Sequence, residues 1–275
     1  MNTPRPADGD ALRQFRLDGR VAFLSGATGQ LGRPMAEALA GAGAHVVLNA
    51  RRGDVLGSLL QELTERGYTA SAACFDVTDE SAVAKNIALI GEKLGRLDIV
   101  VNNASHGRTG TLENITPADF EQSYRVNVVA AFCILQAAVP LLKQSAKSTA
   151  GSSVVNIASM YGSVSPDASI YGTSGANNPP SYGAAKAGLI QLTRYAACHL
   201  AADRIRVNCI SPGPFPAKKY LDNDPGFHER LRAKVPMRRT GDAHEMTGPL
   251  LFLASDASSY VTGINLAVDG GWTAW

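Results

Sequence analysis

The chain has 275 residues, of which 45% are hydrophobic and 18% are charged. That size allows a large buried core in one domain or two. The formal net charge is +2. This balance excludes the strong positive charge by which nucleic-acid-binding and membrane-surface proteins attract their partners.

Four scattered cysteines show no Cys-x-x-Cys spacing, and we expect them to be small buried residues in a reducing compartment. No apolar run suggests a membrane span, and the start, "MNTPRPADGDALRQF", contains no hydrophobic stretch of a signal peptide. We therefore expect a cytoplasmic protein in which residues 1–16 form a mobile tail. The five histidines lack metal-ligand spacing, so no metal site is predicted.

Short apolar runs alternate with helix-like segments from Val21 onward. The runs are rich in Val and Ile and are continuous, which is typical of strands buried on both faces of a parallel sheet. They cover residues 21–26, 45–50, 71–77, 97–104, 152–159, 204–212 and 264–270.

This alternation predicts an α/β fold: a Rossmann-type doubly wound, seven-stranded parallel sheet with helices on both faces. Helices are expected at residues 119–142 and 182–200. Another is expected after Thr78 or Asp79, either of which can cap it. No break in composition divides the chain, so residues 17–275 are expected to form a single domain.

Three glycines, Gly26, Gly29 and Gly32, stand three residues apart where the first predicted strand leads into a helix. Glycines at such a turn let the backbone approach a pyrophosphate, and the helix N-terminus then offers it unpaired N–H groups. Because the cluster follows the first strand of an alternating pattern, it predicts a dinucleotide site.

The second predicted strand ends in Asn49, Ala50, Arg51 and Arg52. An acidic residue at this place would bind the ribose 2′-hydroxyl of NAD. Arginine instead pairs with a 2′-phosphate, and Asn49 has no charge to repel one. NADP(H) is therefore the favoured cofactor, with NAD(H) as the alternative.

The stretch "NPPSYGAAKAG", residues 178–188, places Tyr182 and Lys186 about one helical turn apart. A free tyrosine with a pKa of about 10 is only about 0.1% ionised at neutral pH. A nearby ammonium favours the phenolate and makes the phenol a more useful acid/base. Taken alone, such a pair is more often part of a solvated helix surface than of a catalytic site.

Several further motifs occur in a characteristic order, and with them the chain resembles the compact, single-domain short-chain dehydrogenases/reductases from residue 17 to its end. These motifs are the glycine loop, "DV" at 76–77, "NNAS" at 102–105, "VN" at 126–127, "NIAS" ending at Ser159, the Tyr182–Lys186 pair, "SPGPF" from residue 211, and "FLASDASSYVTGINLAVDGG" near the C-terminus.

The resemblance implies that Tyr182 is the acid/base and that Lys186 holds the nicotinamide ribose. It also implies that Ser159 donates to the substrate oxygen and that Asn127 anchors a water relay to Lys186. A structural amide in an apolar helix is the competing account of Asn127. Together with the strand-end residues, the predicted cofactor contacts are Gly26, Thr28, Gln30, Leu31, Asn49, Arg51, Asp76, Val77, Asn103, Ala104, Tyr182, Lys186, Pro212, Gly213 and Phe215.

Two features depart from the family pattern. Gln30 stands in the loop where a further glycine is more usual, which is similar to the extended branch that epimerises or dehydrates nucleotide sugars. Ser159 and Tyr182 are 23 residues apart, further than usual, and the excess at about 165–180 reads as an inserted loop. Pro179 and Pro180 close this loop and let a helix begin after them.

The predicted function is an NAD(P)(H)-dependent oxidoreductase that interconverts a secondary alcohol and a ketone. The polar inserted loop favours a polyol or sugar acid, as in the gluconate 5-dehydrogenase-like group that the chain resembles. A basic flap at about 214–240 is expected beside the substrate. The alternatives are a 3-oxoacyl carrier-protein reductase, a nucleotide-sugar epimerase or dehydratase, and a non-catalytic NADP-sensing protein.

The partners expected are a small-molecule substrate and further copies of the chain, without nucleic acid or membrane. The apolar helices at 119–142 and 182–200 are candidates for the contact of a homodimer or homotetramer. The two tryptophans of "GGWTAW" are expected to pack at such a contact.

Overall fold

A seven-stranded parallel sheet forms the centre of the computed structural model, which describes residues 11–174, 177–217 and 225–275. Within these residues the strand order is β3-β2-β1-β4-β5-β6-β7, which confirms the predicted doubly wound sheet. The strands are β1 (Val21–Leu24), β2 (His45–Ala50), β3 (Ala70–Cys74), β4 (Ile99–Asn102), β5 (Ser152–Ile157), β6 (Ile205–Pro212) and β7 (Asn265–Val268).

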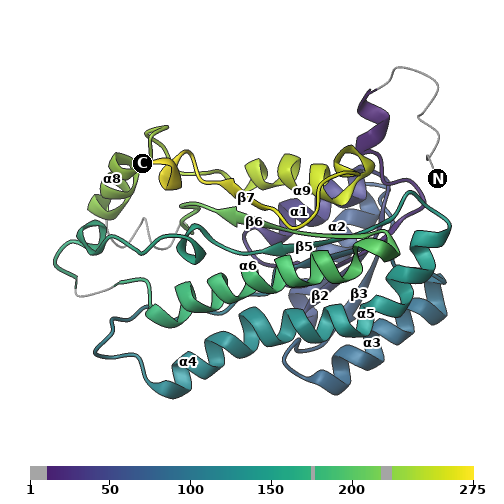
Figure 1. Ribbon diagram of the computed structural model, residues 1–275, viewed down its shortest axis with the longest axis horizontal. Helices are drawn as coiled ribbons and strands as arrows, with labels where there is room; N and C mark the ends of the chain where they lie inside the picture. The colour runs from purple at the N-terminus through teal and green to yellow at the C-terminus, as the bar shows by residue number, and fades with distance from the viewer. Residues whose placement is uncertain (1–10, 175–176, 218–224) are drawn as a thin grey trace.

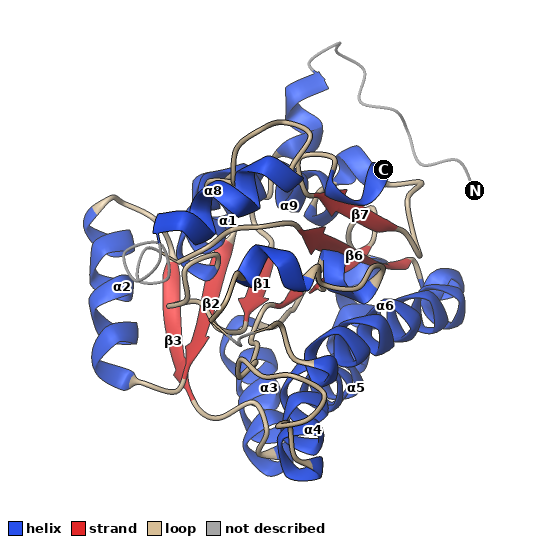
Figure 2. Ribbon diagram, turned by 90° about the vertical axis from the view of Figure 1, so that its left-hand side faces the viewer, coloured by secondary structure: helices blue, strands red, loops and turns tan. Residues whose placement is uncertain are grey.

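Helices cover both faces of the sheet, so that the molecule has three layers (Figures 1 and 2). One face carries α1, α2 and α9, and the other carries α3, α5 and α6. The helices are α1 (Gly32–Gly41), α2 (Gly53–Glu65), α3 (Glu80–Leu94), α4 (Pro117–Tyr124), α5 (Ala130–Lys147), α6 (Pro180–Leu200), α8 (Pro225–Lys234) and α9 (Thr247–Ala254).

The continuous apolar runs are explained by burial on both faces. In β1, Ala22 and Leu24 belong to the core under α1, α2 and α9, whereas Val21 and Phe23 belong to the core under α3, α5 and α6. Successive side chains of a strand point to opposite faces, so a strand with two covered faces has no place for an alternating polar residue.

Helix starts follow the expected signals. The Asp79 side chain accepts a hydrogen bond from the Ala82 N–H and caps α3, which begins at Glu80. Pro180 is the first residue of α6, where its fixed φ angle suits a helix and its missing N–H costs nothing. The two prolines therefore place Tyr182 in the first turn of a long helix.

The segment Pro117–Lys147, which contains α4 and α5, is long and apolar enough to cross a membrane, contrary to the prediction from sequence. In the fold this segment belongs to a helical layer. Ile134, Ala138 and Leu142 are buried in the core that α5 shares with the sheet. Its apolar character therefore has an explanation within the molecule, and the cytoplasmic location stays a prediction.

Three further expectations need correction. Residues 11–15 form a short 3₁₀ helix, and residues 1–10 of the expected tail lie outside the described residues. Cys74 and Cys198 are exposed, because the edge strand β3 and one face of α6 face solvent. Trp272 is 8% exposed and packs inside its own chain, whereas Trp275 is 73% exposed.

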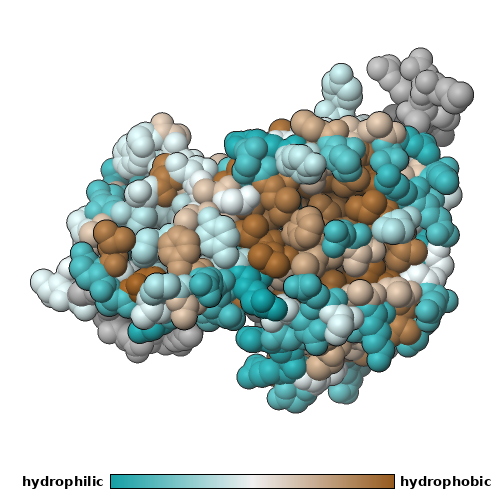
Figure 3. All heavy atoms as spheres, turned by 60° about the horizontal axis from the view of Figure 1, so that its bottom comes forward, coloured by the Kyte–Doolittle hydropathy of each residue, from teal (hydrophilic) through white to brown (hydrophobic). Residues whose placement is uncertain are grey.

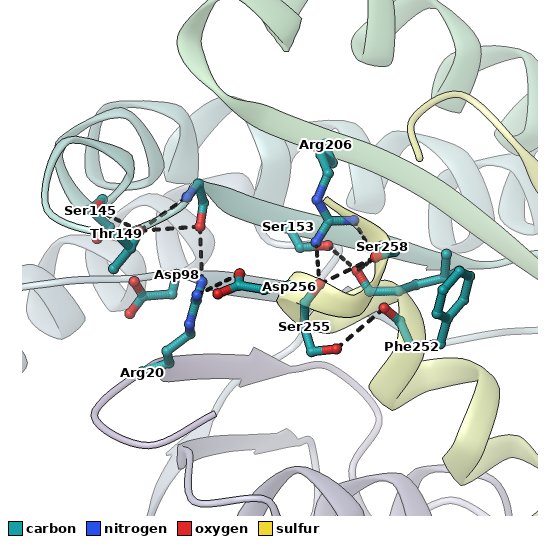
Figure 4. A network of polar contacts seen from close by, with 12 residues as sticks. Arg20, Asp98, Ser145, Thr149, Ser153, Arg206, Phe252, Ser255, Asp256 and Ser258 are labelled. Carbon is teal, nitrogen blue, oxygen red and sulfur yellow. Dashed lines mark hydrogen bonds and ion pairs between the residues drawn. The ribbon is translucent and has the colours of Figure 1, made fainter. Parts of the chain in front are cut away.

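A polar network joins the chain segments at the amino ends of the strands (Figure 4). The Arg20 guanidinium donates to the Gly151 carbonyl at 2.9 Å and to the Asp256 carboxylate at 2.7 Å. Arg206 donates to the Ser258 hydroxyl at 2.6 Å. These bonds tie β1, β5 and β6 to the turn after α9, at the edge opposite the strands' carboxyl ends.

Replacing Arg20 by alanine is expected to lower the free energy of unfolding by about 2 kcal/mol, because it removes two hydrogen bonds from a side chain that is only 11% exposed. The measurement is urea unfolding, with cofactor affinity expected to stay unchanged. In the matched control Arg16→Ala, the lost ion pair is exposed by 53% and 64%, so the change in the free energy of unfolding should be clearly smaller. Equal effects of the two variants would contradict the prediction.

Candidate active site

The carboxyl end of β5 and the first turns of α6 bring Ser159, Tyr182 and Lys186 together. The Lys186 Nζ atom lies 5.5 Å from the centre of the Tyr182 ring and donates to the Ile157 carbonyl at 2.7 Å. Lys186 is only 2% exposed and Ser159 only 7%. The predicted trio therefore shares one place at the carboxyl edge of the sheet, where ligands of doubly wound folds bind.

Close approach between backbones makes this meeting possible. Ser159 begins a short 3₁₀ turn over Met160–Gly162 and accepts a hydrogen bond from the Tyr161 N–H at 3.2 Å. A side chain at Gly183 would place its Cβ only 2.9 Å from the Tyr161 carbonyl oxygen. The glycine that follows the tyrosine in the sequence thus lets α6 lie against the serine turn.

The protonation of the pair differs from the sequence-based expectation. Burial raises the pKa of Tyr182 above its ordinary value, more than the neighbouring Ser159 and Ser105 hydroxyls lower it. Burial also lowers the pKa of Lys186 to about 7. Desolvation of both charged forms therefore outweighs the expected lowering of the tyrosine pKa by the ammonium.

Asn127 lies in a π-helical turn, Arg125–Val129, between α4 and α5. Its Nδ2 atom donates to the carbonyls of His106 and Ser123, both at 2.8 Å, and its Oδ1 atom accepts from the Ser105 hydroxyl at 2.9 Å. Both the nitrogen and the oxygen of this amide therefore have hydrogen-bond partners within the fold, as expected if Asn127 has a structural role. It also reaches Tyr182 indirectly, since Ser105 acts on that phenol. The water relay to Lys186 stays a prediction.

The glycine loop turns directly from β1 into α1. Gly26 has a φ angle of +63°, and a Cβ at Gly32 would lie 2.1 Å from the Gly26 carbonyl oxygen, so the turn cannot close around a larger residue. Thr28 is half-buried in this loop, and Leu31 immediately precedes α1. The backbone therefore has the tight turn and free helix start that fit a pyrophosphate.

Gln30 has a specific place in the structure. Its amide donates at 3.3 Å to the carbonyls of Phe215 and Pro216, which follow β6. The unusual residue therefore links the glycine loop to the segment that carries Gly213.

The residues predicted to contact the adenosine lie at the carboxyl ends of β2 and β3. Some of them are exposed and others are buried. Arg51 is exposed and lies 3.8 Å from the Asp76 carboxylate. Burial opposes ionisation of Asp76, but the Thr78 N–H and hydroxyl and the Arg51 charge hold its pKa below its usual value. Val77 and Asn49 are buried, and the Asn49 amide donates to the carbonyls of Ala73 and Phe75. Asn49 thus bridges β2 and the end of β3, and its contact with the cofactor stays a prediction.

The remaining predicted residues lie between the adenosine end of the site and the Ser159–Tyr182–Lys186 group. Some of them stabilise the glycine loop, and others line a cavity. The Asn103 amide donates to the Gly26 carbonyl at 3.0 Å, and Ala104 lies directly beneath that glycine. A cavity of about 180 Å³ lies near Lys186. Its lining includes Leu31, Asn103, Ser105, Ser159, Tyr182, Lys186, Pro212, Gly213 and Phe215.

A second cavity of about 510 Å³ adjoins the first and shares Ser159, Tyr182, Gly213 and Phe215 with it. Its other walls include residues 107–109, the inserted loop and α8. They include Arg108, Thr109, Met160, Tyr161, Tyr171, Asn178, Phe227 and Leu231. Ser159 and Tyr182 thus stand at the junction of a cavity suited to a nicotinamide and one suited to a substrate.

The structure adds residues that the sequence analysis did not select. Ser105 lies between Asn127 and Tyr182, although the sequence marked it only as the last letter of "NNAS". The Ser25 hydroxyl accepts from the N–H groups of Asn103 and Ala104 and joins β1 to β4. Tyr161, two residues after Ser159, lines the larger cavity. A single sequence gives no signal for these tertiary contacts.

Comparison with known proteins agrees with this geometry. The family model described as enoyl-(acyl carrier protein) reductase matches residues 26–273. A rhamnolipids biosynthesis 3-oxoacyl-[acyl-carrier-protein] reductase of Pseudomonas aeruginosa is 33% identical over 94% of this chain and 98% of its own length. The gluconate 5-dehydrogenase of Gluconobacter oxydans is also 33% identical, over 94% of this chain and 96% of its own.

Among solved structures, a gluconate 5-dehydrogenase from Burkholderia cenocepacia in complex with NADP and tartrate has a TM-score of 0.87 and 31% identity. The similarity covers 96% of this chain and 99% of that one. Because the sequence match runs from the glycine loop almost to the C-terminus, the chain belongs to the short-chain dehydrogenase/reductase family of oxidoreductases.

Proposed function

We propose that this protein is an NADP(H)-dependent oxidoreductase that interconverts a secondary alcohol and a ketone on a polyol or sugar acid. The observation that carries the proposal is the position of Ser159 and Tyr182 at the junction of two cavities, with Lys186 behind them. In the reduction of a ketone, the carbonyl carbon receives a hydride and the adjacent oxygen receives a proton. At the junction of the two cavities, a substrate can contact the nicotinamide and Tyr182 at the same time.

The residues present fit a dinucleotide. The glycine loop turns so tightly that a Cβ at Gly32 would collide with the Gly26 carbonyl oxygen, and such a turn lets the backbone approach a pyrophosphate. When bound, the nicotinamide supplies or accepts the hydride. Tyr182 gives the proton to the ketone oxygen in reduction and takes it from the alcohol in oxidation. Ser159 donates a hydrogen bond to the same oxygen and stabilises the charge that develops there. Lys186 binds the nicotinamide ribose and, when protonated, favours the phenolate.

NADP(H) is supported by two observations. The Arg51 guanidinium is exposed at the end of β2, where a 2′-phosphate would lie, and the similar Burkholderia cenocepacia structure contains NADP. Asp76 lies 3.8 Å from Arg51, and the guanidinium is 76% exposed, so this weak pair leaves it accessible to a phosphate.

A polyhydroxylated substrate is supported by the hydroxyl and amide groups of the larger cavity, contributed by Tyr161, Tyr171 and Asn178. Arg108 lines the same cavity, and its guanidinium, which is 62% exposed, pairs with Asp119 at 3.2 Å through one of its nitrogens. A substrate carboxylate would have to share this guanidinium with Asp119. The Gluconobacter oxydans relative is a gluconate 5-dehydrogenase. The second candidate is 3-oxoacyl thioester reduction, favoured by the apolar walls at Met160, Phe227 and Leu231 and by the Pseudomonas aeruginosa relative.

We further propose a homodimer or homotetramer assembled through α5 and α6. Figure 3 shows a broad apolar area on the face formed by the lower helices of Figure 1. Exposed large side chains at the start of α5 and on α6 include Val129 and Phe132, at 39% and 44%, and Tyr195, at 67%. Burial of such an area against another copy is favourable.

Replacing Tyr182 by phenylalanine is expected to lower kcat by about 10²–10⁴-fold, because the hydroxyl that moves the proton is lost while the ring remains. The measurement is NADPH absorbance with hexonates, hexitols and 3-oxoacyl thioesters as substrates. Affinity for NADP⁺ should change little. Unchanged turnover in this variant would sink the acid/base assignment, and turnover of acyl thioesters alone would exclude the polyol substrate.

Lys186 predicts a pH dependence of stability in the cofactor-free enzyme. Its pKa is about 7 when folded and 10.5 as an ordinary lysine, so the unfolded chain holds more protons between these values. The contribution of Lys186 to the free energy of unfolding therefore rises with pH from about 7 towards 10. Relative to Lys186→Met, the wild-type melting temperature should increase across this window. Lys143→Met, at an exposed ion pair, should show a nearly constant difference. A constant difference for Lys186→Met as well would contradict the low pKa.

Replacing Arg51 by alanine is expected to raise KM for NADP⁺ by about 10- to 100-fold, the effect of losing charge-assisted hydrogen bonds. KM for NAD⁺ should stay nearly constant, because NAD⁺ has no 2′-phosphate. The control Arg66→Ala removes an exposed arginine from the other end of α2. Parallel changes in both cofactors would mean that Arg51 does not select between them.

A further inference from the structure

The inserted segment between Ser159 and Tyr182 packs as a wall of the larger cavity. Ile170 lies in it and is only 1% exposed. It belongs to a small apolar cluster with Met160, Leu231, Val235 and Trp272, which is separate from the two main cores. In Figure 1, α8 and the C-terminus lie together at one end of the molecule. The insertion, α8 and the C-terminal turn therefore share a core of their own.

Polar contacts fix the same segment to its neighbours. The Arg230 Nε atom of α8 donates to the Ile170 carbonyl at 2.7 Å. The Lys234 ammonium lies 2.5 Å from the Asp167 carboxylate, and these side chains are 47% and 37% exposed. On the other side, the Asn177 carbonyl accepts from the Gly110 N–H at 3.1 Å. The described part of the insertion is thus held from two directions.

Tyr171 follows Ile170 and lines the larger cavity with Ser159 and Tyr182. Its ring lies 5.6 Å from the ring of Phe227, centre to centre, so the aromatic plane is held by α8. A phenol hydroxyl carries one hydrogen that it can donate. Because the Tyr171 ring packs against α8 and lines the cavity, this hydrogen is available to a ligand that binds there.

We propose that Tyr171 is a specificity-determining residue, whose hydroxyl donates to a substrate hydroxyl other than the one that reacts. The inference rests on the proposed function and narrows it to substrates that carry such a second hydroxyl. A fixed phenol in an aromatic wall discriminates strongly, because a substrate without a partner leaves a desolvated polar group unpaired.

The choice of Tyr171 over its neighbours follows from its surroundings. Ile170 packs in the apolar cluster, and Tyr161 lies on the turn directly after Ser159, outside the insertion. Ser159 and Tyr182 serve the reacting oxygen under the proposed mechanism. A second hydroxyl of the substrate therefore finds its donor on the insertion, which the usual short connection between serine and tyrosine would not supply.

The test compares wild type with Tyr171→Phe on hexonates, hexitols and their monodeoxy analogues, with NADP⁺ and absorbance detection. The ring and its packing remain in this variant, so only the hydroxyl is lost. For the best hydroxylated substrate we expect kcat/KM to fall about tenfold, mainly through KM. One monodeoxy analogue, which lacks the recognised hydroxyl, should be turned over equally by both enzymes.

Two controls separate this effect from a disturbed wall. Tyr260→Phe removes a hydroxyl from a fully exposed tyrosine in the turn after α9 and should leave all constants unchanged. In a Trp275→Phe background, Trp272 is the remaining tryptophan. It reports on the cluster around Ile170, and its emission should be the same with and without Tyr171→Phe.

The outcomes distinguish the inference from the proposed function. If wild type oxidises hydroxylated substrates and Tyr171→Phe matches it, or loses activity equally on every analogue, the inference is wrong and the proposed function stands. If wild type oxidises other alcohols or reduces acyl thioesters but no hexonate or hexitol, the proposed substrate class fails, and the inference fails with it.

Discussion

Burial of the Lys186 amine beside Tyr182 is the interaction on which the site depends. The amine is 2% exposed and is held by the Ile157 carbonyl at 2.7 Å, so it joins the end of β5 to α6. Burial disfavours the ammonium and brings its pKa to about 7. The same desolvation raises the pKa of Tyr182. The chain alone therefore keeps the phenol neutral and leaves the amine only partly protonated at neutral pH.

This constraint explains the local sequence around the pair. A buried amine can reach the β5 carbonyl only if α6 lies close to the turn after β5. Gly183 provides that contact, because a Cβ there would lie 2.9 Å from the Tyr161 carbonyl oxygen. Pro180 fixes where the helix starts and hence the direction in which Tyr182 points. Small residues and prolines around the tyrosine are thus consequences of geometry.

Features that depend on local sequence patterns could be predicted, whereas features that depend on tertiary contacts could not. Continuous apolar runs predicted the strands, and a four-residue spacing predicted that Tyr182 and Lys186 share a helix face. The sequence did not reveal that Asn49 bridges two strands, because a strand-end position does not show to which side an amide turns; its Nδ2 atom donates to the carbonyls of Ala73 and Phe75. Ser105 was missed because its partner, Asn127, is distant in sequence. The exposure of Cys74 likewise depends on β3 being an edge strand.

The inserted segment shows how one fold separates chemistry from recognition. The groups assigned to proton transfer stand after β5 and on α6, two elements that pack in the main cores, where rearrangement would disturb the sheet. The insertion instead packs with α8 and Trp272 in a separate cluster. A change there can reshape the larger cavity while the contact between Lys186 and Ile157 stays intact. Because the shared core also fixes Tyr171, a loop rich in polar residues acquires the rigidity that selective hydrogen bonding requires.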